Sequence, residues 1–210
     1  ASVNDTTRAG SEVVKQVESP KISGLLYPIL QALDEEYLDV DMQFGGVDQR
    51  KIFMFARENL PSIGYEKRVH LMNPMMRGLT KSGKMSSSEP KSKIDYFDTD
   101  EDIENKVQDA YSKDGDVDNG LLDICKYILF PMWKKRDKTF TVERPDEYGG
   151  DVTFETYDEL ETAFENKELS SIDLKENLSE SIIEFIRPIR EELSAHKELI
   201  NEAYPEDEPE

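Results

Sequence analysis

The sequence predicts an α/β fold in which a small parallel sheet is followed by a mostly helical region. Two short runs rich in strand-forming residues, 40–44 and 69–72, each end in a glycine or proline turn. A helical pattern separates them, and strands that alternate with helices usually pair in parallel. Beyond residue 96 the apolar residues recur mainly at helical spacing. We therefore place a domain boundary near residue 96.

Each expected element follows from its own pattern. In 23–38 apolar residues recur every three or four positions, and Gly45-Gly46 indicates a sharp turn after the first strand. Pro188 predicts a kink in the last helix. In the first part we expect an amphipathic segment at 9–17 and helices at 23–38 and 47–59. In the second part we expect helices at 103–111, 120–132, 157–166 and 173–193, and a hairpin of 139–142 with 152–154 around Gly149-Gly150.

Composition limits the classes of function. The 210 residues carry a net charge of −20 and one cysteine, so an internal disulfide framework is excluded and Cys125 is interpreted as a buried apolar residue. No apolar run approaches the ~18 residues of a membrane span, which predicts a soluble cytosolic protein without a membrane partner. An acidic surface repels nucleic acid unless basic residues cluster, as they do at 50–51, 81–93 and 134–138.

The Lys-Met-Ser-Ser-Ser run at 84–88 is the most informative motif. One ammonium, from Lys84, and three hydroxyls, from Ser86, Ser87 and Ser88, lie in a Gly/Ser/Lys-rich stretch. This combination suits a polyphosphate that must be held and then released. The alternative is a linker that ends in a helix cap, because Ser86 and Glu89 have capping-box spacing.

Two further patterns lie upstream of this run. Gly46 and Asp48 follow the first strand, where a glycine lets the backbone approach a ligand and a carboxylate can bind ribose or cap a helix. Together with the Lys/Ser run they predict a nucleotide site at the carboxyl ends of parallel strands. Tyr27, Gln31 and Asp34 share one helical face, which predicts either a site for a ligand with a hydroxyl and an ammonium or a solvated polar stripe.

Taken together, these motifs resemble tyrosyl-tRNA synthetases of the archaeal and eukaryotic type, which are class I enzymes. The resemblance extends over roughly residues 8–205. Four stretches carry it: LYPILQALDEEY at 26–37, QFGGVDQRK at 43–51, HLMNPM at 70–75 and KMSSS at 84–88. The last of these is similar to the family's KMSKS motif.

The resemblance implies a tyrosine–tRNA ligase, which activates tyrosine with ATP, assisted by Mg²⁺, and transfers it to tRNA-Tyr. It implies that 1–95 are the C-terminal part of a Rossmann-like catalytic domain, that 96–205 are an α-helical anticodon-binding domain, and that 206–210 are a disordered acidic tail. No protein ligand for a metal is predicted. Tyrosine would be bound by Tyr27, Gln31, Asp34 and Gln49, and ATP by Gly46, Asp48, Leu71, Met72 and Lys84, with Lys84, Ser86, Ser87 and Ser88 catalytic.

The resemblance also implies tRNA contacts. Arg50, Lys51 and Met54 would meet the first base pair of the acceptor stem. Tyr148 and Asp173 would form the pocket for the first anticodon base, where an aromatic ring stacks and a carboxylate accepts from a guanine edge. Ser170 stands where the archaeal pattern often has a histidine. The family works as a homodimer in the cytoplasm.

One departure from the family concerns its HIGH-like motif. The chain has two histidines, His70 and His196, and neither lies in such a context. We therefore expect the C-terminal part of the enzyme, which alone activates tyrosine very poorly or not at all. Two alternatives remain: a non-catalytic tRNA-binding or regulatory fragment of the same ancestry, and an acidic helical interaction protein whose motifs are accidental.

Overall fold

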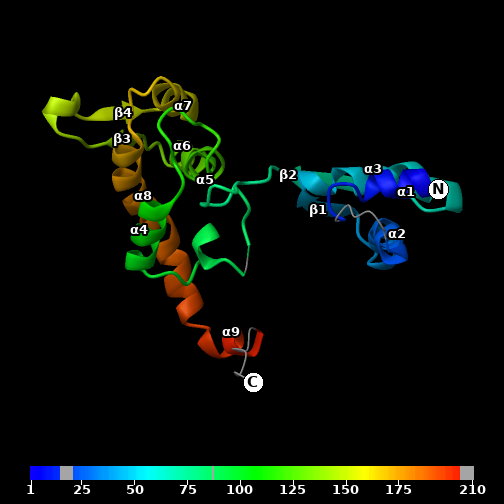
Figure 1. Ribbon diagram of the computed structural model, residues 1–210. Helices are drawn as coiled ribbons and strands as arrows, with labels where there is room; N and C mark the ends of the chain where they lie inside the picture. Colours follow the sequence, from blue (N-terminus) through cyan, green and yellow to red (C-terminus); the bar gives the residue numbers. More distant parts are fainter. Residues whose placement is uncertain (15–20, 87, 204–210) are drawn as a thin grey trace. The chain divides into compact units, whose positions relative to one another are not determined.

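The computed structural model describes residues 1–14, 21–86 and 88–203, and the chain divides after Met75 into two units (Figure 1). The predicted acidic tail at 206–210 and the end of the segment predicted at 9–17 lie outside the described residues. Each unit has its own core and is described by itself.

The first unit combines helices with a two-stranded sheet. The strands are parallel, with Phe44 opposite Leu71, which confirms the predicted pairing. A single 3-10 turn, Val47–Gln49, joins the first strand to the helix after it. The elements are α1 (Val3–Ala9), α2 (Ile22–Tyr37), β1 (Met42–Gly46), α3 (Arg50–Asn59), a 3-10 turn (Leu60–Ile63) and β2 (Val69–Asn73).

The glycine pair does not form the turn that we predicted. Gly45 and Gly46 are the last residues of β1, and Gly46 is extended, with φ −71° and ψ 157°. The chain changes direction in the 3-10 turn that follows. At Gly45 the packing is tight: a Cβ there would lie 3.0 Å from the Phe53 ring, which would have to shift slightly to accommodate it.

Side chains from three elements meet in the core of the first unit. His70 on β2 is bonded through Nε2 to Oε2 of Glu35 on α2 at 2.7 Å. The imidazole also stacks on Phe53 of α3, with ring centroids 4.8 Å apart and planes 6° apart. Both members of the polar pair are buried. This contact therefore links α2, which carries three of the residues predicted to bind tyrosine, to the sheet.

The second unit is mostly helical, as predicted, with an antiparallel hairpin in register from Phe140–Phe154 to Val142–Val152. The longest helix, α8, continues through Pro188. The elements are a 3-10 turn (Pro90–Ser92), α4 (Asp100–Asp109), α5 (Gly120–Ile124), α6 (Phe130–Lys135), β3 (Phe140–Val142), β4 (Val152–Phe154), α7 (Tyr157–Glu165), α8 (Ser171–Ser194) and α9 (Lys197–Ala203).

The predicted helix at 120–132 is interrupted. A π-helical turn, Cys125–Leu129, lies between α5 and α6. Pro131 follows after one residue and has no amide hydrogen to donate, which removes one bond of the regular α-helical ladder at this point. Cys125 is completely buried, which confirms its interpretation as an apolar residue, and burial raises the pKa of its thiol.

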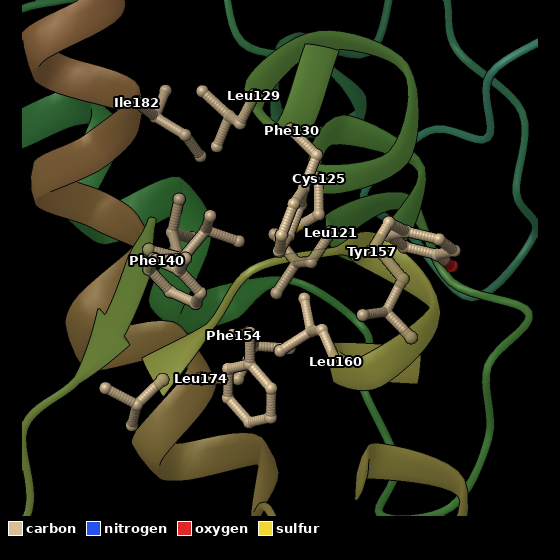
Figure 2. Packing of buried hydrophobic residues seen from close by; sticks show 14 of the residues in the cluster. Leu121, Cys125, Leu129, Phe130, Phe140, Phe154, Tyr157, Leu160, Leu174 and Ile182 are labelled. Atoms are coloured by element: carbon tan, nitrogen blue, oxygen red, sulfur yellow. The ribbon is translucent and has the colours of Figure 1, made fainter. Parts of the chain in front are cut away.

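Aromatic and aliphatic side chains from α5, α6, α7, α8 and the hairpin pack into one core (Figure 2). Trp133 stacks on Phe140 with centroids 5.0 Å apart, and Phe130 meets Tyr157 edge-on. Leu174 and Ile182 bring one face of α8 to this cluster. The core holds the hairpin against α8.

The segment that carries the Lys/Ser run packs with the second unit. Leu79 belongs to the large core, its amide donates to the Ser92 carbonyl at 2.8 Å, and its carbonyl accepts from Tyr111 at 2.7 Å. The division after Met75 therefore precedes the boundary that we predicted near residue 96. The assignment of 1–95 and 96–205 to different functions stays a prediction.

Candidate nucleotide and tRNA sites

Three predicted site residues form a hydrogen-bonded chain at the end of β1. Gln31 Nε2 donates to Gln49 Oε1 at 2.9 Å, and Gln49 Nε2 donates to Asp48 Oδ2 at 2.9 Å. Gln31 comes from α2, and the other two come from the 3-10 turn after the strand. Gln31 Oε1 is buried and has no hydrogen-bond partner among the described residues. A buried acceptor without a hydrogen bond destabilises the folded protein. A ligand that donates a hydrogen bond to this oxygen would therefore bind more tightly.

Two other residues that were predicted to bind the tyrosine substrate, Tyr27 and Asp34, lie on the same helix as Gln31. Tyr27 is one turn before Gln31, and its side chain is half exposed. Asp34 is also exposed. For neither side chain is a hydrogen bond recorded within the described part of the chain. Both are thus available to a ligand on the surface that α2 presents, and their roles stay predictions.

Gly46 can be replaced by no other residue without rearrangement. A Cβ at this position would lie 2.4 Å from Asp48 Oδ1 and 2.8 Å from Met75 Sδ. Since real Cβ contacts are not that short, the glycine keeps the backbone open beside Asp48. On the neighbouring strand, Leu71 and Met72 are consecutive and point to opposite faces of the sheet. Their side chains therefore cannot both lie on the same face of an adenine ring.

In the second unit, the Lys/Ser run is held at its base by Ser92. The Ser92 hydroxyl accepts from the Ser86 amide at 2.9 Å and lies 2.7 Å from the Glu89 carbonyl and 3.2 Å from the Ser86 carbonyl. Ser92 is completely buried. The Ser92 hydroxyl thus satisfies backbone groups that regular secondary structure would otherwise pair.

The functional groups of the loop face solvent. Lys84 is exposed, and the hydroxyls of Ser86 and Ser88 are 2.9 Å apart. Ser87 lies outside the described residues. The helix-cap alternative is wrong, because no helix begins at Ser86 and the next helical turn starts only at Pro90.

The start of this segment is also closely packed. A Cβ on Gly78 would lie 2.5 Å from the Lys84 carbonyl oxygen and 2.8 Å from that of Ser92. Next to it, the buried Asp123 carboxylate accepts from the Arg77 amide at 2.7 Å and from its guanidinium at 3.0 Å. The loop therefore projects from a base that is bonded to α5.

The predicted acceptor-stem residues share one hollow of the first unit. Arg50, Lys51 and Met54 line a cavity of about 180 Å³ between α1 and α3, together with Arg8. Lys51 Nζ contacts Glu12 at 2.6 Å, so this ammonium is paired in the unbound chain. Arg8 was missed in the sequence, because an isolated arginine on a short helix carries no pattern.

The predicted anticodon residues lie near the start of α8 and at the tip of the hairpin. Tyr148 is exposed in the 3-10 turn Asp146–Tyr148. Asp173 is in the first turn of α8, where Ser170 Oγ donates to its Oδ2 at 2.8 Å. Asn177, one turn later, bonds both the amide and the carbonyl of Glu143 on the hairpin, at 2.9 and 3.2 Å. The hairpin is thus attached to this end of the helix.

Comparison with known proteins identifies the family. Residues 1–187 match the family described as tRNA synthetases class I (W and Y). The chain belongs to this family. It is similar to the cytoplasmic tyrosine–tRNA ligase of Saccharomyces cerevisiae, with 48% identity over 203 residues, which are 94% of this chain and 52% of the relative. The tyrosine–tRNA ligase of Haloarcula marismortui is 45% identical over 206 residues, which are 98% of this chain and 59% of the relative.

Solved structures agree with this membership in the class I synthetase family. Tyrosyl-tRNA synthetase from Archaeoglobus fulgidus, complexed with L-tyrosine, matches with a TM-score of 0.74 and 38% identity, over 91% of this chain and 58% of that one. The chain thus spans about half the length of the curated relatives that it matches. The match confirms the predicted family and fold class.

Within residues 1–14, 21–86 and 88–203, no group of three or more His, Cys, Asp or Glu side chains is arranged to hold a metal ion. In the same part of this class I synthetase chain, every helix is too short or too polar to cross a membrane.

Proposed function

We propose that this chain is the C-terminal part of a tyrosine–tRNA ligase and binds tyrosine, ATP and tRNA-Tyr. The observation that carries the proposal is the Gln31–Gln49–Asp48 chain, which ends in the buried Oε1 of Gln31, an acceptor without a partner in the described part of the chain. The names of the relatives support the same activity.

At the amino-acid end, Gln31 Oε1 would accept from the tyrosine ammonium. Tyr27 would meet the substrate one turn before Gln31, and Asp34 one turn after it, at the phenol. A site built to hydrogen-bond a hydroxyl rejects an analogue that lacks it by about 10⁴- to 10⁵-fold, because buried polar groups are then left unpaired. The site would therefore select tyrosine over phenylalanine.

At the nucleotide end, Gly46 leaves room for the ATP ribose, whose hydroxyls would bond to Asp48. Leu71 and Met72 would flank adenine, one by its side chain and the other through the backbone. The tyrosine carboxylate attacks the α-phosphorus, tyrosyl-adenylate forms and pyrophosphate leaves. Lys84 would stabilise the charge that develops on pyrophosphate, and the hydroxyls of the Ser86–Ser88 run would bond its oxygens.

Mg²⁺ receives no protein ligands in this proposal. The described residues contain no cluster suited to it, and this ion commonly keeps waters and binds through substrate phosphates. When bound with ATP it would neutralise phosphate charge. No step is derived through it.

For tRNA, Arg50 and Lys51 would meet the first acceptor base pair with Met54 beside them. The Lys51–Glu12 contact would open on binding. Tyr148 would stack on the first anticodon base, and Asp173 would accept from its edge while Ser170 fixes the carboxylate. The whole enzyme would act as a homodimer in the cytoplasm, where the eukaryotic relatives are named as acting.

A second candidate is a tRNA-binding fragment without catalytic function. The helical second unit favours this candidate, because it has its own core and carries both predicted anticodon residues, Tyr148 and Asp173. Binding of a sulfamoyl analogue of tyrosyl-adenylate, measured by calorimetry, separates the two. If the chain keeps a working tyrosine site, it should bind the tyrosyl analogue more tightly than the phenylalanyl analogue. Binding of tRNA-Tyr without any binding of the analogue would favour the fragment.

A further inference from the structure

An exposed basic turn joins α6 to β3. We define it as Lys134, Lys135, Arg136 and Lys138, all of which are exposed. Lys138 pairs with Glu184 at 2.8 Å, whereas the other three have no ion pair recorded within the described part of the chain. Arg136 also acts electrostatically on Glu184 without an ion pair. On a protein with a net charge of −20, consecutive cations such as Lys134, Lys135 and Arg136 are a local excess that attracts an anion.

The basic turn is held rigidly by the core. The amides of Arg136 and Lys138 both donate to the Trp133 carbonyl, at 2.9 and 3.0 Å. Asp137 between them has φ 51°, the left-handed conformation that this kind of helix end requires. Trp133 is buried and stacks on Phe140 at the start of β3. Both ends of the turn are therefore anchored, so less backbone entropy is lost when a ligand binds.

Helix stabilisation explains only part of the cluster. Cations in the last turn of a helix interact favourably with its dipole. Lys134 and Lys135 lie in that last turn of α6. Arg136 and Lys138 lie beyond the helix, where this effect is small, and the turn continues the positive charge toward β3.

The position of the basic turn along α8 suggests its ligand. Lys138 contacts Glu184, and the predicted anticodon residue Asp173 lies on the same helix. Glu184 lies eleven positions after Asp173, which at 1.5 Å per residue is about 16 Å along the axis of α8. The basic turn and the predicted anticodon residue are therefore close enough for one arm of a tRNA to reach both.

We propose that the basic turn binds the phosphodiester backbone of the base-paired stem next to the anticodon loop of tRNA-Tyr. The inference rests on the proposed function and adds a contact to it. Ammonium and guanidinium groups would contact phosphate oxygens, so the contact carries no base preference of its own.

Acidic side chains on the other side of the turn limit the contact. Glu143, Glu176 and Glu180 line a hollow of about 630 Å³ between the hairpin and α8, next to Lys138. The hydrogen bond from Lys138 lowers the pKa of Glu184, which keeps this carboxylate ionised. These acids repel phosphate from the α8 surface. The RNA backbone can therefore meet the outward side of the turn but not the hollow.

The test compares two double variants of the 210-residue chain. Lys134→Gln/Lys135→Gln removes two charges from the basic turn. Lys21→Gln/Lys67→Gln removes two exposed lysines that likewise have no ion pair recorded within the described residues. Fluorescence anisotropy with a labelled tRNA-Tyr transcript gives the Kd over a series of KCl concentrations.

For the basic-turn variant we expect a Kd roughly tenfold higher at low salt, and a log Kd–log salt slope smaller by about 1.5, since each lost phosphate contact removes about 0.7–0.9. The control should stay within about twofold of wild type. The loss should persist with a hairpin of the anticodon arm alone and be absent with an acceptor-stem hairpin. Trp133 fluorescence, the single tryptophan signal, reports that both variants are folded.

Equal affinities and salt slopes for the two variants would overturn the inference. If wild type still prefers tRNA-Tyr over a transcript with a changed anticodon, that result leaves the proposed function intact. If wild type binds no tRNA, both proposals fail together. A loss confined to the acceptor-stem hairpin would overturn the assigned position. Binding to phosphatidylserine vesicles that depends on the turn, without such binding to tRNA, would identify a membrane surface instead.

Discussion

The hydroxyl of buried Ser92 accepts a hydrogen bond from the amide of Ser86 at 2.9 Å and so fixes the start of the Ser86–Ser88 run. The same hydroxyl reaches two carbonyls of the loop. A residue without any predicted role thus positions Ser86, which was predicted to bind phosphate.

Replacing Ser92 should loosen this loop. Ser92→Ala leaves the buried amide and carbonyls without their partner, which costs about 1–3 kcal/mol in the free energy of unfolding. Hydrogen exchange should speed up at the Ser86 amide in particular. Ser194→Ala, which removes an exposed hydroxyl bonded to the Arg190 carbonyl, should change stability by less than about 0.5 kcal/mol. Unchanged exchange at Ser86 would contradict the anchoring role.

The Glu35–His70 pair should be important for the first unit. Glu35→Ala removes one member of a buried polar pair and leaves the imidazole without this hydrogen bond, which typically costs about 1–3 kcal/mol. Urea unfolding followed by circular dichroism measures the loss. Glu66→Ala, at a side chain that is 89% exposed, is the control and should be almost neutral. Similar midpoints for the two variants would show that the pair does not stabilise the unit.

Acid should weaken the contact between α4 and α8. Hydrogen bonds from Arg190 and Arg187 lower the pKa of Asp100 below its usual 3.8. Because the folded pKa is the lower one, the stabilisation is present above about pH 4 and is lost as the pH falls through the folded value.

The matching variant is Asp100→Asn. Its free energy of unfolding should fall less than that of wild type between pH 5 and pH 2, both measured by denaturant titration at each of about four pH values. Glu147→Gln, an exposed carboxylate without a recorded side-chain contact in the described structure, should follow the wild-type curve. Parallel curves for wild type and Asp100→Asn would refute the contribution of this carboxylate.

Stacking by Tyr148 should contribute to tRNA binding. Loss of an aromatic platform costs about 1–3 kcal/mol per stacked base, so Tyr148→Ala should weaken tRNA-Tyr binding by roughly tenfold. Tyr96→Ala, which removes another exposed tyrosine, serves as the control. Filter binding gives both affinities. If the two variants bind equally well, the role assigned to Tyr148 is wrong.

The sequence predicted most of the fold because its strongest patterns are periodic. The apolar stripe of α8 through Leu174, Leu178 and Ile182 is buried as expected. The parallel pairing of β1 with β2 followed from the alternation of strands and helices. The π-helical turn at Cys125–Leu129 was not predictable, because its residues fit an ordinary amphipathic helix and only Pro131 marks the irregularity.

The candidate site could be predicted only where a motif exists. The resemblance to the synthetase family named Gln31, Asp48 and Gln49, which the structure brings together. Ser92 and Asp123 carry no pattern, because a serine in a polar loop and an acid in a helix look like surface residues. Their importance comes from burial, which depends on packing between distant segments.

The most direct measurement of the central claim uses the buried Oε1 of Gln31, which has no hydrogen-bond partner within the described residues. Gln31→Leu keeps the approximate size of the side chain and removes this acceptor together with the Nε2 donor to Gln49. Gln108→Leu makes the same change at an exposed position of α4. Calorimetry compares their affinities for the tyrosyl sulfamoyl-adenosine analogue. Our account predicts that binding weakens by roughly tenfold or more in Gln31→Leu and is unchanged in Gln108→Leu. Equal affinity of wild type and Gln31→Leu would contradict a tyrosine site at this position.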